Sequence, residues 1–152
     1  MSRLLVTDAS PLIALDRVEH LDLLPRLHDD IVAPSAVVSE FGRCPAWLRE
    51  EVIEDREAVR RMILRGLHEG ESEALVLARS LPGPLLLIDE KRGRKVAVEF
   101  GLEIIGTAGL LLAAKRVGLI ARVRPVLDAL LGDHDFRLAK RHYYVLREAG
   151  EA

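Results

Sequence analysis

The length, composition and charge of the chain exclude several classes of protein. Its 152 residues are 49% hydrophobic and 30% charged, with a formal net charge of −2. A chain of this length and apolar content can bury a core, which excludes intrinsic disorder and favours one globular domain. Its longest apolar stretches fall far short of the ~18–20 residues of a membrane-spanning helix.

Three residues bear on the cellular compartment. Arg3 and Asp8 interrupt the N-terminus before the apolar core of a signal peptide could form. The single cysteine, Cys44, excludes an internal disulfide and the cysteine-rich zinc patterns, which fits a reducing compartment. We therefore expect a cytoplasmic protein with no membrane association.

The sign of the charge differs along the chain. Residues 1–88 hold 10 basic and 15 acidic side chains, whereas residues 89–152 hold 12 basic and 9 acidic ones. An acidic metal site beside a basic surface for a polyanion would produce this pattern, and so would chance on two solvated surfaces.

Short apolar runs alternate with helical patterns through the whole chain. In the first half we expect strands at Arg3–Thr7 and Ile31–Ala33. We expect helices at three places between them and after them: one capped by Ser10 with Pro11 as its first residue, one over Leu21–His28 and a short one from Pro34 to Gly42. A loop at Gly42–Trp47 should then lead to an amphipathic helix over Glu50–Arg65 with Val59, Met62 and Ile63 inward. In the second half we expect a helix over Glu71–Leu81, strands at Leu85–Ile88 and Ile104–Ile105, and helices over Lys91–Phe100, Ala108–Val117, Val123–Leu131 and Phe136–Glu148.

Strands separated by helices require crossovers, and such strands form a parallel sheet covered on both faces. The expected fold is therefore α/β, a three-layer α/β/α sandwich with a central mostly parallel sheet. We expect residues 1–152 to form a single domain, with residues 133–152 as a C-terminal helical extension.

Two aspartates directly follow expected strands. Asp8 follows the first strand and Asp89 follows Leu85–Ile88. In an open parallel sheet, ligands bind outside the carboxyl ends of the strands, so neighbouring strands would bring both carboxylates into one crevice. They would repel one another unless a cation lay between them. Alternatively, Asp8 only makes a turn and Asp89 only caps the next helix.

Glu40 lies in the last turn of a short helix that Gly42 ends. The negative end of the helix dipole disfavours a carboxylate there by roughly 0.3–1 kcal/mol. Either Arg43 compensates for this charge on the surface, or a bound divalent metal does.

Glu69, Glu71 and Glu73 surround the start of one helix. Residues two apart point in nearly opposite directions, so Glu71 and Glu73 cannot both enter one site. We choose Glu73, which directly precedes the apolar run, although simple stabilisation of a helix N-terminus explains each of the three. Asp8, Glu40, Glu73 and Asp89 would form an all-oxygen set suited to Mg²⁺ or Mn²⁺, which implies phosphate chemistry.

Five segments together resemble the PIN-domain nucleases, and more narrowly a PIN-like subfamily of prokaryotic toxins from toxin–antitoxin pairs. They are Asp8-Ala-Ser-Pro-Leu-Ile, Pro34-Ser-Ala-Val-Val-Ser-Glu40, Gly70-Glu-Ser-Glu73-Ala, Leu86-Leu-Ile-Asp89-Glu-Lys-Arg-Gly-Arg94 and the run from Gly106 to Ile120. The resemblance covers about residues 3–130. Each motif is weak alone, but five in the right order are fairly specific.

The resemblance implies a PIN-like fold and a Mg²⁺- or Mn²⁺-dependent endoribonuclease that cleaves single-stranded RNA, usually as a homodimer, with a small antitoxin protein as a partner. Asp8, Glu40, Glu73 and Asp89 would be the catalytic metal ligands. Two departures are that Glu73 stands where the wider family commonly has Asp, and Ile88 where a hydroxyl residue often precedes the strand-end Asp.

Several further residues are candidates for the same site. Lys91, Arg92, Arg94 and Lys95 follow Asp89 and would bind the phosphates that flank the scissile bond, or form only a solvated helix face. Thr107 would hydrogen-bond a metal-bound water or a phosphate, or act only as a helix cap. Glu90 is a possible fifth acid or a first-turn helix stabiliser.

Three other functions compete with a nuclease. The first is a catalytically weak PIN-like interaction module that binds an antitoxin or nucleic acid. The second is a receiver-type phosphoacceptor domain, which would need an acidic pair at the end of the first strand. The third is a haloacid-dehalogenase-like phosphatase, which would need an aspartate where Ser10 stands.

Overall fold

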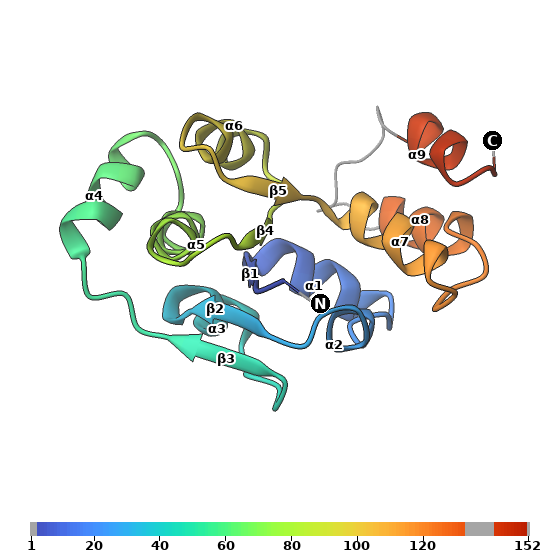
Figure 1. Cartoon of the computed structure of the whole chain (residues 1–152), viewed down its shortest axis with the longest axis horizontal. Helices are drawn as coiled ribbons and strands as arrows, with labels where there is room; N and C mark the ends of the chain where they lie inside the picture. Colours follow the sequence, from blue (N-terminus) through green and yellow to red (C-terminus); the bar gives the residue numbers. More distant parts are fainter. Residues whose placement is uncertain (1–2, 133–141, 152) are drawn as a thin grey trace.

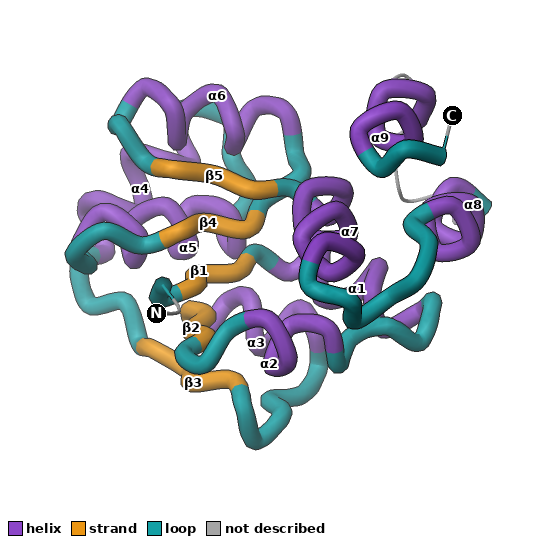
Figure 2. The backbone as a smooth tube through the Cα atoms, turned by 45° about the vertical axis from the view of Figure 1, so that its right-hand side comes forward, coloured by secondary structure: helices purple, strands orange, loops and turns teal. Residues whose placement is uncertain are grey.

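The structure is a computed structural model that describes residues 3–132 and 142–151 (Figure 1). Its centre is a five-stranded sheet in the order β3-β2-β1-β4-β5, and every pair of neighbouring strands is parallel. The strands are β1 (Leu5–Thr7), β2 (Ile31–Pro34), β3 (Leu48–Glu51), β4 (Leu85–Leu87) and β5 (Glu103–Ile105). Figure 2 shows them side by side in this order. The predicted three-layer α/β/α sandwich is confirmed.

Helices connect and cover the strands. They are α1 (Ala9–Arg17), α2 (Leu23–Leu27), α3 (Ser35–Phe41), α4 (Arg56–Leu64), α5 (Glu69–Ser80), α6 (Lys91–Glu99), α7 (Thr107–Arg116), α8 (Arg124–Leu131) and α9 (His142–Glu148). Within the described ranges, no helix has both the length and the apolar character that crossing a membrane requires.

The two faces of the sheet bury two separate apolar clusters. Leu5 of β1 and Leu87 of β4 point to the cluster that α1, α2, α3, α7, α8 and α9 complete. Val6 and Leu86, one position away on the same strands, point to the cluster that α4, α5 and α6 complete. Successive side chains of a strand face opposite ways, so these uncharged strands are buried on both faces.

The order of the strands creates a switch point between β1 and β4. From β1 the chain continues outward to β2 and β3, whereas β4 and β5 extend the sheet on the other side. The connections therefore leave β1 and β4 in opposite directions, and in sheets of this kind ligands bind at the carboxyl ends of the two strands. Asp8 and Asp89 follow these two ends.

The region between residues 42 and 65 differs from the prediction. An edge strand, β3, occupies Leu48–Glu51, where we expected the end of a loop and the start of a helix. The amphipathic helix accordingly begins at Arg56, capped by Asp55, instead of at Glu50. Val59 and Met62 are buried as expected, but Ile63 is 44% exposed, so its inward placement was wrong.

Other helix ends differ by a few residues. Asp8, not Ser10, is the N-cap of α1, and Ala9 is its first residue. Gly42 ends α3 in a left-handed conformation with φ 91°, which glycine adopts without strain. The described part of the expected helix Phe136–Glu148 is α9, and residues 136–141 lie outside the described residues.

Candidate active site

Asp8 lies between the carboxyl ends of β1 and β4. Thr7 and Leu87 are opposite one another in the two strands, and the Asp8 N–H donates to the Leu87 carbonyl over 3.0 Å. The Asp8 residue is only 3% exposed, and it makes no ion pair within the described part of the chain.

Burial raises the pKa of Asp8 from 3.8 to about 7, against a hydrogen bond from the Ala9 backbone that lowers it. The negative charges of Glu71, Glu40 and Asp89 raise the same pKa further. Glu71, Glu40 and Asp89 are therefore close enough to act on Asp8, and we call Asp8, Glu40, Glu71 and Asp89 the acidic cluster.

Glu40 reaches the cluster from α3, on the exposed side. A Cβ added to Gly70 would lie 3.4 Å from Glu40 Oε1 and 3.8 Å from Asp8 Oδ1, so the two carboxylates approach the same glycine. The alternative explanation for Glu40, compensation by Arg43, does not hold, because Arg43 bonds Asp16 at 2.6 Å.

Glu73 is not brought into the cluster. Its Oε1 accepts from the Ala36 N–H at 3.0 Å, and its Oε2 accepts from Arg56 at 2.7 Å. Both oxygens of this buried carboxylate are therefore committed to holding α3 and α4 against α5. Glu71, two positions earlier, is instead one of the carboxylates whose charge acts on Asp8.

Glu71 is the acidic residue that the sequence reasoning missed. It is 6% exposed, and burial raises its pKa to about 7, against a backbone hydrogen bond from His68 that lowers it. That N–H donates to Glu71 Oε1 at 3.0 Å. The neighbouring Glu90 carboxyl raises the pKa of Glu71 as well. The sequence did indicate that Glu71 and Glu73 point in nearly opposite directions. Which of the two lies near Asp8 depends on how the helix packs, and the sequence does not show that.

Asp89 is held in one orientation by the start of α7. Thr107 donates its N–H to Asp89 Oδ1 at 2.8 Å and its hydroxyl to Oδ2 at 2.5 Å. Thr107 is fully buried and is the first residue of α7, after the N-cap Gly106. It is therefore not the helix cap, and its hydroxyl bonds Asp89 instead. A Cβ on Gly106 would lie 2.8 Å from Asp89 Oδ1 and 2.9 Å from Arg94 Nη1, so a larger residue at position 106 would displace one of these two side chains.

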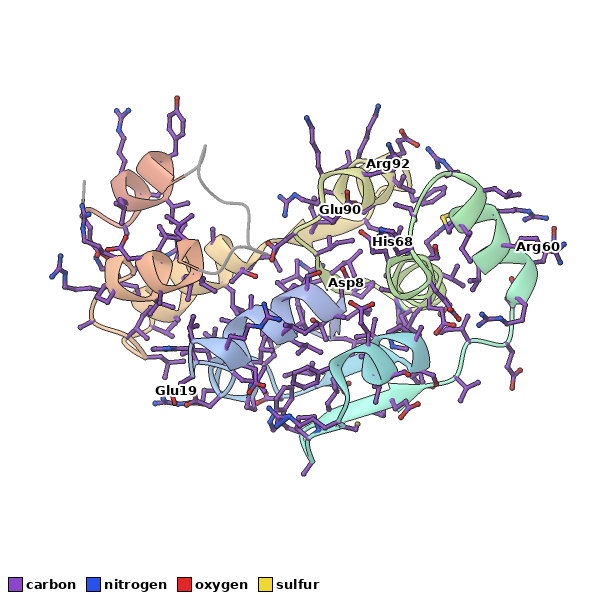
Figure 3. The ribbon with its side chains drawn as sticks, turned by 180° about the vertical axis from the view of Figure 1, so that it is seen from behind. Asp8, Glu19, Arg60, His68, Glu90 and Arg92 are labelled. Atoms are coloured by element: carbon purple, nitrogen blue, oxygen red, sulfur yellow. The ribbon has the colours of Figure 1, made fainter. Side chains whose placement is uncertain are left out.

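The basic residues of α6 divide into two groups. Lys91, Arg92 and Lys95 are exposed, and Arg92 reaches the Gly66 carbonyl at 3.4 Å. Arg94 instead points inward and donates to the Ile88 carbonyl at 2.9 Å. In Figure 3, Asp8, Glu90, His68 and Arg92 lie in the same central region, whereas Arg60 projects away on α4.

Comparison with known proteins identifies the family of the chain. The family model DUF3368, described as a PIN domain, matches residues 4–151. The chain belongs to the PIN-domain family. No curated protein and no solved structure matches the chain. PIN domains are generally nucleases that use divalent metals.

The acids of this PIN domain fit a hard divalent cation in their chemistry. All donors are carboxylate oxygens, and Glu71 Oε2 is buried with no hydrogen-bond partner among the residues the structure describes. Over the same residues, however, no three Asp, Glu, His or Cys side chains converge tightly enough to enclose an ion by themselves. Mg²⁺ usually keeps several waters and binds through one or two carboxylates, so an open cluster suits it.

Proposed function

We propose that this PIN domain is a Mg²⁺- or Mn²⁺-dependent endoribonuclease that hydrolyses phosphodiester bonds in single-stranded RNA. The observation that carries the proposal is the environment of Asp8. Asp8 is buried, three other carboxylates raise its pKa, and no described residue forms an ion pair with it. Such a group is stable as an anion only when a cation joins it.

The residues of the acidic cluster differ in how they would hold the ion. Asp8 and Glu71 are the buried ligands, and Glu40 binds from the exposed side, directly or through water. Thr107 fixes the orientation of Asp89, as outer hydrogen bonds commonly do for metal ligands. When bound, the ion supplies an activated water at neutral pH and stabilises the charge of the departing oxygen.

The exposed basic residues would bind the RNA backbone. Lys91, Arg92 and Lys95 begin beside Asp89 and extend along the exposed side of α6. Phosphate contacts position a nucleic acid without reading its sequence. Arg94 has a different task, since its bond to the Ile88 carbonyl holds the turn that carries Asp89.

The biological role rests on the family resemblance. We propose that the protein is the toxin of a toxin–antitoxin pair, a cytoplasmic homodimer whose partner is a small antitoxin protein. We also propose that residues 1–152 form one domain with a C-terminal extension from residue 133.

A catalytically weak PIN-like module that only binds RNA or an antitoxin is the second candidate. The observation in its favour is that Thr107 occupies both oxygens of Asp89, which leaves fewer open carboxylate oxygens in the cluster.

Cleavage of a labelled single-stranded RNA separates the two candidates. With Mn²⁺, the wild type should cleave, EDTA should abolish cleavage, and Asp8→Asn should lower the rate at least a hundredfold. Asp22→Asn is the matched control, because Asp22 is an exposed aspartate that pairs with Arg26 at 3.6 Å. RNA binding without cleavage by the wild type would support the second candidate. Full cleavage by Asp8→Asn would refute the metal-site assignment.

A further inference from the structure

A pocket of about 240 Å³ lies at the amino ends of β4 and β5, where Pro84 and Leu102 precede the two strands. The acidic cluster lies at the carboxyl ends of the sheet, so the pocket is separate from it. Sites for drug-sized ligands have volumes of roughly 300–1,000 Å³, and this smaller pocket therefore suits a single small group.

The walls of the pocket combine apolar and charged side chains. The apolar ones include Leu81, Phe100 and Leu102, and the charged ones are Arg3, Arg79 and Glu103. Arg3 donates to Glu103 at 2.7 Å and to two backbone carbonyls, those of Gly83 and Pro84, at 3.1 Å each. The charges of Arg3 and Glu103 therefore balance one another.

Arg79 is the third charged residue of the pocket, and it makes no ion pair within the described part of the chain. Its guanidinium lies over the ring of Phe100, 3.8 Å from the ring centre. Arg79 is exposed, whereas Phe100 is half-buried. Contact with the ring holds the guanidinium in place, so another planar group can stack on it at a small entropic cost.

A nucleobase fits these surroundings better than a phosphate does. α5 ends at Ser80 and α6 ends at Glu99, and their next residues, Leu81 and Phe100, line the pocket. The negative ends of two helix dipoles therefore disfavour an anion inside it. A nucleobase is uncharged, stacks on aromatic rings and guanidinium planes, and carries polar groups at its edge.

A row of arginines connects the pocket with the acidic cluster. Arg92, in the first turn of α6, reaches the carbonyl of Gly66 at 3.4 Å. Arg65, the preceding residue, pairs with Glu99 at the other end of α6 and lies 5.8 Å from the centre of the Phe100 ring. The nine residues of α6 extend over about 14 Å, a distance that a few nucleotides of single-stranded RNA can span.

We infer that the pocket binds one base of the RNA strand whose scissile bond lies at the acidic cluster, with the guanidinium of Arg79 between that base and the Phe100 ring. The RNA backbone follows α6, where Arg92 and the remaining N–H groups of Arg65 contact its phosphates. The inference deepens the proposed function and rests on it, because the ligand is the proposed substrate.

Binding of a labelled single-stranded RNA in EDTA, followed by fluorescence anisotropy, tests the inference without cleavage. Arg79→Ala should weaken binding about tenfold, as expected for the loss of one stacked base. Arg79→Lys keeps the charge but not the planar guanidinium, and it should weaken binding nearly as much. Arg116→Ala is the matched control and should bind as the wild type does. Arg116 is likewise exposed in the last turn of its helix and has no ion-pair partner among the described residues.

Phe100→Leu tests the other layer of the stack. Phe100 packs against the apolar cluster of α4, α5 and α6, and Leu preserves an apolar side chain there. The variant should therefore fold, as urea denaturation would verify, but bind RNA several-fold more weakly because Arg79 loses the aromatic ring that holds it.

A free nucleotide is the other source of a base, and AMP is the probe for it. If AMP binds as tightly as the RNA and with the same dependence on Arg79, the pocket serves a free nucleotide and the inference fails. Wild-type affinity for RNA in Arg79→Lys would also overturn it. An equal loss in Arg116→Ala, or the absence of RNA binding by the wild type, would do the same.

The outcomes separate this inference from the proposed function. If the wild type cleaves RNA with Mn²⁺ but its RNA binding does not depend on Arg79, the nuclease proposal stands and the inference fails. If RNA binding depends on Arg79 but no metal-dependent cleavage occurs, the inference stands and the nuclease proposal fails.

Discussion

Replacing Asp8 by Asn should stabilise the protein when divalent metals are removed. Burial and three neighbouring carboxylates raise the pKa of Asp8 from 3.8 to about 7. The folded state therefore keeps a proton that the unfolded state releases near pH 4, and wild-type stability falls as the pH rises from about 4 to about 7. About 3 pH units at 1.36 kcal/mol each set an upper bound of about 4 kcal/mol. Asn carries no charge and avoids this cost.

Urea denaturation in EDTA measures the effect. At pH 8.5, Asp8→Asn should exceed the wild type by about 2–4 kcal/mol in free energy of unfolding, and at pH 5 by clearly less. Asp22→Asn should show no such pH-dependent difference. With Mn²⁺ the order should reverse, because the ion stabilises only the protein that binds it. An Asp8→Asn variant that is less stable than the wild type by the same amount at both pH values would refute the reasoning.

The remaining predictions concern three other residues. Glu73→Gln breaks the ion pair with the half-exposed Arg56, so it should lower the free energy of unfolding by about 1–2 kcal/mol in urea. RNA cleavage should persist. Loss of cleavage in a variant of unchanged stability would place Glu73 in the active site. Thr107→Val removes the hydroxyl bond to Asp89 and should weaken Mn²⁺ binding by about 10–100-fold in a titration; unchanged affinity would contradict the assigned role of Thr107. Burial opposes ionisation of Glu151, but hydrogen bonds from a lysine and two backbone N–H groups lower its pKa to about 2. The stabilisation that ionised Glu151 gives the folded state is therefore complete above about pH 4.5 and lost as the pH falls through 2. Glu151→Gln should lower the free energy of unfolding at pH 7 and have little effect at pH 2 in denaturation curves; an equal effect at both pH values would count against this role of Glu151.

The central strands could be predicted because their residues are buried on both faces. Leu85–Leu87 is a continuous apolar run, and no other class of element fits so short a segment. The edge strand β3 was missed for the opposite reason. Leu48 is its one buried residue, and the following Arg49, Glu50 and Glu51 resemble the charged helix that comes next. The position of β3 is determined by its pairing with β2, and the local sequence pattern does not indicate that pairing.

The acidic cluster was predictable only in part. Asp8 and Asp89 follow strands whose adjacency is a property of the fold class, so their approach could be expected. The choice between Glu71 and Glu73 depends on the rotation of α5 about its axis, which the burial of residues such as Ala74 and Leu75 fixes. The partner of Glu73, Arg56, lies 17 residues away on another helix, and the sequence gives no sign of that pair.

The most direct test of a divalent ion at the acidic cluster is diffraction from Mn²⁺-soaked crystals on both sides of the manganese absorption edge. We predict an anomalous peak in contact with Asp8 and Glu71, with Glu40 on its exposed side and Glu73 still bonded to Arg56. The absence of any peak near Asp8, at Mn²⁺ concentrations that support RNA cleavage, would contradict the account.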